Sequence, residues 1–167
     1  MVYKNTSYAN RGATFERLII MANNKYRNSG IADIRKVPTP IQITKDNGRF
    51  VEGRKEKAEW VDFAGVYEGR SITFDAKEIS NASFPLDNLS NHQYELLESW
   101  HKNNAFSFLL VSFRKYNKTY LLPFEVLQMS WEAVKMAVEN QYHTRPLKMS
   151  VLRLSRRMDI RCIIWIR

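Results

Sequence analysis

Two aspartates and a lysine lie close together in the stretch WVDFAGVYEGRSITFDAK. In its second half, RSITFDAK, apolar and polar residues alternate. Side chains repeat every two residues along a strand, so we expect Asp75 and Lys77 to share one face. If Glu68 and Gly69 form a two-residue turn, Asp62 lies directly opposite Asp75, with Cβ atoms ~4.5–5.5 Å apart. Two carboxylates at that separation can share one divalent cation, and their oxygen ligands favour Mg²⁺ or Mn²⁺.

This geometry depends on the turn. A bulge at Gly69 would shift the pairing, and an uncompensated shift of one residue would send Asp62 to the opposite face. Directly opposed like charges destabilise a sheet, so the pair needs either a cation or the ammonium of Lys77 to balance it. The pattern therefore indicates either a site for metal-assisted hydrolysis or a strand end with balanced, solvent-exposed charges.

The rest of the chain predicts the elements that hold this hairpin. Apolar residues recur at helical spacing in three segments, residues 14–28, 91–103 and 124–141. Extended segments are expected in ADIRKVPTPIQI, in the apolar AFSFLLVSF, and in KTYLLPF, which follows a turn at Asn117. Helices and strands mixed in this order predict an α/β fold, a single domain over residues 1–167 with a central mixed sheet flanked by helices.

The polar segment TKDNGRFVEGRKEKAE, about residues 44–59, has two glycines and weak periodicity. We expect it to protrude from the domain. The C-terminal segment, residues 143–167, is different, because it carries seven basic residues and one acid.

Composition narrows the partners and the location. A net charge of +9 and a pI of about 9.7 favour an anionic partner, most commonly nucleic acid. One cysteine and three scattered histidines argue against a disulfide framework and against zinc. No apolar run approaches the ~20 residues that span a bilayer, and the N-terminal residues show no signal-peptide pattern. We therefore expect a soluble, cytoplasmic protein without a membrane partner.

Five blocks in order resemble the RecU-type Holliday-junction resolvases of the PD-(D/E)xK nuclease superfamily. They are NRGATFE, KVPTPIQI, DFAGVYEGRSITFDAKE, FPLDNLSNHQ and FSFLLVSF, within roughly residues 10–124. The resemblance implies a restriction-endonuclease-like core, a homodimer, and metal-dependent nicking of two opposed strands of a four-way DNA junction. It also implies that the protruding segment is the family's stalk, in a short form that is compatible with a phage-encoded member.

The resemblance assigns roles around the hairpin. Asp62 and Asp75 would bind the metal, with the carbonyl of Ala76 as a third ligand. Lys77 would position the attacking water or stabilise charge on the phosphate oxygens. Two features depart from the family. Asp75 stands where glutamate is usual, and the bulky pair before Asp62 replaces small hydroxylated residues.

Two further positions match the family and also have structural interpretations. Glu16 matches an acid on the first helix, although an acid in a first turn also interacts favourably with the helix dipole. Gln93 matches a glutamine that faces the active site, but Ser90-x-x-Gln93 is also a capping box. Its neighbour His92 is either a surface histidine, the more common case, or a base.

Basic residues are the candidates for DNA contact, with solvated surface charge as the alternative. They are Arg11, the stalk residues Lys45, Arg49, Arg54, Lys55 and Lys57, and the C-terminal residues Arg153, Arg156 and Arg157. The leading hypothesis is an endonuclease that resolves four-way junctions. The alternatives are a nuclease of this superfamily that acts on other branched or duplex DNA, and a junction-binding protein without cleavage.

Overall fold

The computed structural model describes residues 9–56 and 60–140. Its core is a five-stranded sheet with the strand order β1-β4-β5-β6-β7. The strands are β1 (Ala32–Lys36), β4 (Phe63–Tyr67), β5 (Arg70–Ile79), β6 (Phe106–Phe113) and β7 (Lys118–Pro123). Strands β5 and β6 pair in parallel, and the other neighbours are antiparallel. The predicted α/β fold with a mixed sheet is confirmed.

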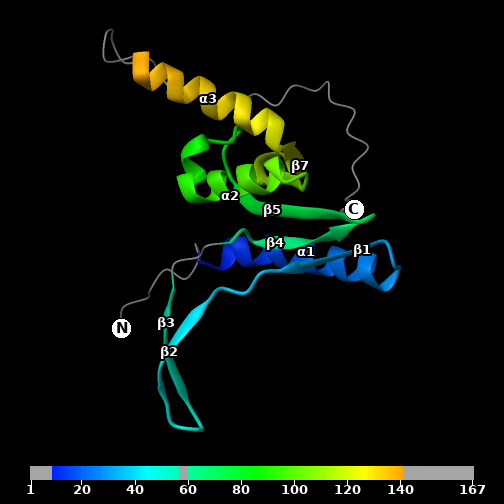
Figure 1. Ribbon diagram of the computed structural model, residues 1–167, viewed down its shortest axis with the longest axis vertical. Coiled ribbons are helices and arrows are strands. Elements are labelled where there is room, and N and C mark those ends of the chain that lie inside the picture. The colour runs from blue at the N-terminus through cyan, green and yellow to red at the C-terminus, as the bar shows by residue number, and fades with distance from the viewer. Residues whose placement is uncertain (1–8, 57–59, 141–167) are drawn as a thin grey trace.

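Helices cover both faces of this sheet (Figure 1). Helix α1 (Ala9–Asn28) lies on one face, and α2 (Asn91–Lys102) lies on the other. Helix α3 (Phe124–Asn140) directly follows β7 and lies beyond α2 (Figure 1). No helix among the described residues is long and apolar enough to cross a bilayer.

Two apolar cores follow from this arrangement. Phe15 and Ile19 of α1 pack on the side chains of β5 that include Ile72 and Phe74. Leu97 of α2 packs in a second cluster on the opposite face. Because β5 alternates, its even-numbered residues face α1, and Asp75 and Lys77 face α2.

The remaining predicted elements are also found. The φ angle of Gly30 is +66°, the left-handed conformation that commonly ends a helix, and α1 ends two residues earlier. Strand β6 is almost wholly buried, as its apolar sequence predicts. It continues through a short 3₁₀ turn and Asn117, whose φ is +47°, into antiparallel β7.

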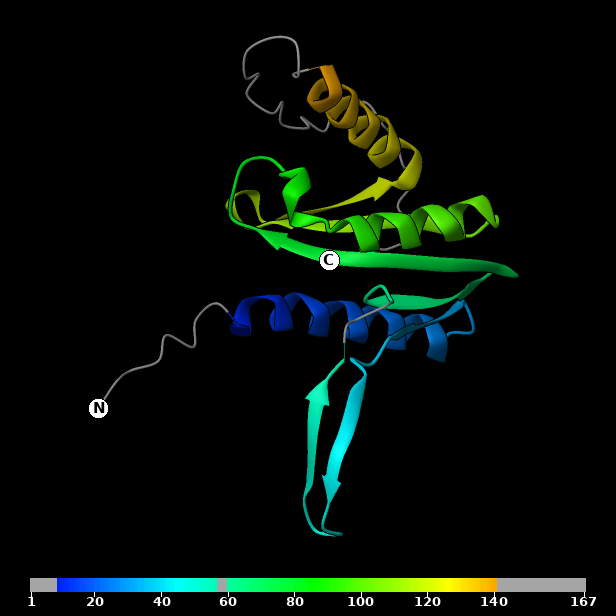
Figure 2. The same ribbon diagram turned by 60° about the vertical axis from the view of Figure 1, so that its left-hand side comes forward.

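A separate hairpin projects away from the sheet (Figure 2). It consists of β2 (Ile41–Asp46) and β3 (Val51–Lys55), and every residue of both strands is exposed. It starts before residue 44, where the sequence placed the beginning of the protruding segment. Residues 57–59, at the end of that expected segment, lie outside the described residues.

Candidate active site

The turn between β4 and β5 fixes the register of the hairpin. Glu68 and Gly69 have φ angles of +48° and +74°, the two positive values that a type I′ turn requires. Pairing then runs without a bulge from Tyr67 opposite Arg70 to the last pair of the ladder. The predicted register is confirmed as far as Phe63 opposite Phe74, and Asp62 follows in a bend just outside the ladder.

The Asp62 side chain replaces a backbone hydrogen bond at the end of the β4–β5 ladder. In a two-residue hairpin the flanking residues exchange both backbone hydrogen bonds, so every second residue of β5 points its N–H and C=O toward β4. The ladder ends at Phe63 opposite Phe74, which leaves the backbone of Ala76 without a strand partner on that side. Asp62 Oδ2 accepts the Ala76 N–H at 3.0 Å. The N–H and C=O of one strand residue point to the same side, so we expect the Ala76 carbonyl on the Asp62 side of β5.

Asp75 is buried under α2. Its side chain is 1% exposed, and the Lys77 ammonium lies 2.8 Å from Oδ2. Oδ1 accepts a hydrogen bond from Gln93 Nε2 at 2.9 Å. Among the described residues, Oδ2 accepts no hydrogen bond of good geometry, so one buried oxygen retains acceptor capacity.

The electrostatics of the site act against the Asp75 charge. Burial raises the pKa of Asp75 to about 6, and the negative charge of Asp62 adds to this shift. The Lys77 ammonium acts in the opposite direction and lowers the pKa. Burial and the Asp62 charge therefore outweigh the Lys77 ammonium, and a divalent cation would favour the charged form of the carboxyl.

Gln93 connects α2 to these charges. Its amide oxygen accepts from Lys77 Nζ at 3.1 Å and from the Ser90 N–H at 3.2 Å. Ser90 Oγ accepts the Gln93 N–H, which completes the capping box. Both sequence interpretations of Gln93 therefore describe one side chain, because the group that caps the helix also positions the Asp75 carboxylate.

The oxygen atoms at the end of the β4–β5 ladder are suitable ligands for a divalent cation. Hard cations prefer carboxylate and carbonyl oxygens, and the edge presents Asp62, Asp75 and the Ala76 carbonyl. The free acceptor capacity of the buried Asp75 Oδ2 supports this reading. Among the described residues, no group of three or more His, Cys, Asp and Glu side chains converges, so the remaining ligands would come from outside these side chains.

Glu16 lies on the α1 side of the sheet, and because α1 begins at Ala9, it is not in the first turn, so the interpretation as a first-turn acid is wrong. Its Oε2 forms an ion pair with Lys36 Nζ of β1. Lys36 is paired with Phe63, the residue directly after Asp62. The first-helix acid is therefore near the site in the sheet, and its recorded contact is a lysine that the sequence analysis did not single out. Lys36 begins the KVPTPIQI block, which was the one signal that pointed to it.

The candidate DNA-binding residues fall into two groups. Lys45, Arg49, Arg54 and Lys55 are exposed on the β2–β3 hairpin, where Arg49 lies 5.7 Å from the Phe50 ring centroid. The other candidates lie outside what the structure describes: the side chain of Arg11, and Lys57, Arg153, Arg156 and Arg157. His92 is half-buried, and its Nε2 has no hydrogen-bond partner among the described residues.

The comparisons with known proteins decide the family. The family described as Recombination protein U (RecU) matches residues 10–164. The chain belongs to the RecU family. Among its relatives, the Holliday junction resolvase RecU of Staphylococcus saprophyticus is 36% identical over 132 residues, 75% of this chain and 64% of the relative. The Holliday junction resolvase RecU of Streptococcus sanguinis is 39% identical over 124 residues, 70% of this chain and 62% of the relative.

The matched part of the chain thus spans less than two thirds of these two RecU proteins. A solved structure is also similar, titled as Archaeoglobus fulgidus Hjc, a Holliday junction resolvase from an archaeal hyperthermophile. It shows 12% identity and a TM-score of 0.46, and covers 69% of this chain and 74% of that chain. Likeness at this level carries no inference about the chemistry of this chain.

Proposed function

We propose that this protein is a metal-dependent endonuclease that resolves four-way DNA junctions by paired nicks. The observation that carries the proposal is the cluster where the β4–β5 ladder ends: Asp62 accepts the Ala76 N–H at 3.0 Å, and the buried Asp75 lies 2.8 Å from the Lys77 ammonium. RecU family membership supports the choice of substrate, because two relatives are named as Holliday junction resolvases.

The residues divide the chemistry among them. Asp62, Asp75 and the Ala76 carbonyl would hold Mg²⁺ or Mn²⁺, which lowers the pKa of a bound water and screens the phosphate charge. Lys77 presents a positive charge where negative charge develops on the phosphate oxygens. Gln93 holds Asp75 Oδ1 by a hydrogen bond of 2.9 Å and so restricts the direction in which Oδ2, the oxygen beside Lys77, points.

Contact with the junction falls to the basic surface. The β2–β3 hairpin acts as the stalk of a single nuclease domain, and its four exposed cations contact phosphates. Glu16, Arg11, Lys57 and the basic C-terminal residues retain the roles that the sequence suggests. One site cuts one strand, so paired nicks need two sites, which a twofold homodimer supplies.

The test is a cleavage assay on a labelled four-way junction with Mg²⁺ or Mn²⁺. We expect symmetric nicks that disappear in Asp75→Asn while junction binding remains. Asp33→Asn is the matched control, because Asp33 is an exposed aspartate of edge strand β1. Equal cutting of linear duplex would refute junction selectivity, and full activity of Asp75→Asn would refute the site.

A further inference from the structure

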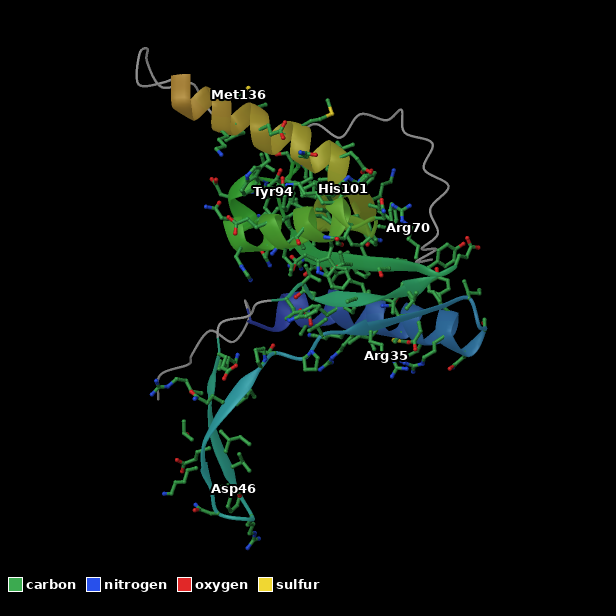
Figure 3. The ribbon with its side chains drawn as sticks, in the orientation of Figure 1. Arg35, Asp46, Arg70, Tyr94, His101 and Met136 are labelled. Carbon is green, nitrogen blue, oxygen red and sulfur yellow. The ribbon has the colours of Figure 1, made fainter. Side chains whose placement is uncertain are left out.

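A groove of about 810 Å³ lies between α2 and α3, and the proposed nuclease chemistry does not use it. Its apolar lining comes from the loop before α2 and from both helices: Leu86, Leu89, Tyr94, Trp131 and Val134. Tyr94 and Trp131 stack with ring centroids 4.4 Å apart and planes at 7°. Figure 3 shows Tyr94 in the layer between the two helices. The groove therefore offers a firm apolar floor.

Four acids surround this floor: Asp87, Glu95, Glu98 and Glu132. Lys135 is the single basic residue of the lining, so the groove carries a net charge of −3. Glu98 forms an ion pair with Lys102, and Glu132 accepts a hydrogen bond from Gln128. Within the described part of the chain, Asp87 and Glu95 form no ion pair.

Burial, Glu98 of α2 and Glu132 of α3 all raise the pKa of the Tyr94 hydroxyl. Burial raises the pKa of Tyr94 to about 12, and the charges of Glu98 and Glu132 add to the shift. Glu98 belongs to α2 and Glu132 to α3, so the two helices direct negative charge into the same space.

The negative charge of the groove limits which molecule can bind in it. The potential of the groove repels phosphates, so DNA does not fit, although the whole chain carries +9. A suitable occupant must offer cations to the rim and apolar side chains to the floor, as a helix or strand does when it docks in a groove.

We propose that the C-terminal segment of this same chain, residues 141–167, occupies the groove. It carries seven basic residues and one acid, a net charge of +6. Apolar residues lie between these cations, as in the stretch SVLRLSRRMDIR. The segment thus has both chemistries that the groove requires.

Chain connectivity favours the same occupant. Helix α3 ends at Asn140, five residues beyond Lys135 at the groove, or about 7.5 Å along the helix axis. The segment begins at the next residue, and its 27 residues could extend over roughly 90 Å. A tethered segment also binds at a high effective concentration, so a modest intrinsic affinity suffices.

The test uses Cys162, the single cysteine of the chain, which lies in this segment. The full-length protein is labelled there with a benzophenone maleimide, irradiated, digested and mapped by mass spectrometry. We expect adducts concentrated in residues 86–98 and 131–135. In Glu95→Lys/Glu132→Lys we expect at least a five-fold loss of these adducts. The control Glu52→Lys/Glu125→Lys makes the same charge change at exposed acids outside the groove and should retain them.

Each other outcome overturns the proposal. Scattered adducts, or groove adducts that survive the Glu95→Lys/Glu132→Lys change, would exclude docking by charge. Chains with and without ¹⁵N, refolded together, distinguish a second copy, because adducts of mixed isotope content would assign the groove to the neighbouring chain. If circular dichroism shows that Glu95→Lys/Glu132→Lys has lost structure, the crosslinking is instead repeated on the wild-type protein in 1 M salt. Screening should then reduce the groove adducts, and unchanged adducts would refute the proposal. The readout needs no nuclease activity, so it is independent of the proposed function.

Discussion

The buried Asp75 makes a quantitative prediction about stability in the absence of metal. Its pKa is about 6 in the folded protein against 3.8 for a free aspartate. Between these pH values the folded protein holds a proton that the unfolded chain releases. The stabilising contribution is therefore complete below about pH 4 and is lost as pH rises through about 6.

The magnitude follows from the size of the shift. A difference of about two pKa units corresponds to about 3 kcal/mol, since one unit equals about 1.4 kcal/mol. Asp75→Asn cannot ionise, so the variant does not lose this contribution. We expect it to gain up to about 3 kcal/mol of unfolding free energy over the wild type between pH 4 and pH 7.5, without metal.

The assay is urea unfolding in EDTA, followed by circular dichroism at half-unit pH steps. For each pH we take the difference in unfolding free energy between Asp75→Asn and the wild type. The change of this difference with pH tests the prediction, because a constant difference reflects packing. Asp33→Asn is the control. The hydrogen bond and charge of Arg35 lower the pKa of the exposed Asp33, so its removal acts in the opposite direction. A difference for Asp75→Asn that stays flat from pH 4 to pH 7.5, or that falls, would refute this reasoning.

Three further predictions concern single groups. Mg²⁺ at 100 times its Kd should raise the unfolding free energy of the wild type by about 2.7 kcal/mol and leave Asp75→Asn unchanged, as measured by urea unfolding. Gly65→Ala should lower the unfolding free energy by about 3 kcal/mol, as measured by thermal melts, because the new Cβ would lie 2.1 Å from Asp33 O. Gly12→Ala is the control: its Cβ would meet no atom within 4 Å, so it should leave stability unchanged or raise it slightly. Gln93→Ala should lower the unfolding free energy by about 1 kcal/mol, because the Ser90 N–H loses its side-chain acceptor, and it should also reduce junction cleavage. Lower stability with full cleavage would show that Gln93 serves only the capping box.

Local chemistry made much of the fold predictable. A two-residue turn and strict alternation fix which side chains of a hairpin oppose one another, so the sequence predicted the register that the ladder shows as far as Phe63 opposite Phe74. The capping box of Ser90 and Gln93 was predictable for the same reason, because its partners lie three residues apart. The apolar run of β6 indicated a strand buried on both faces.

The β2–β3 hairpin shows where such patterns become weak. Both of its strands are exposed on every side, so no burial imposes a period of two on the sequence. Weak periodicity correctly indicated a protruding segment and could not indicate its strands. The start at Ile41 follows from pairing with Lys55, fourteen residues away.

Contacts between distant segments were decided by tertiary structure alone. Gln93 reaches Asp75 and Lys77 because α2 packs across the sheet, which places a helix cap beside a strand 16 to 18 residues earlier. Glu16 meets Lys36 because α1 packs on β1. The sequence by itself determined the types of the catalytic candidates and their alternation along one strand, since both are local. The burial of Asp75, which raises its pKa, depends on which elements pack over it, and packing across the sheet leaves no local pattern in the sequence.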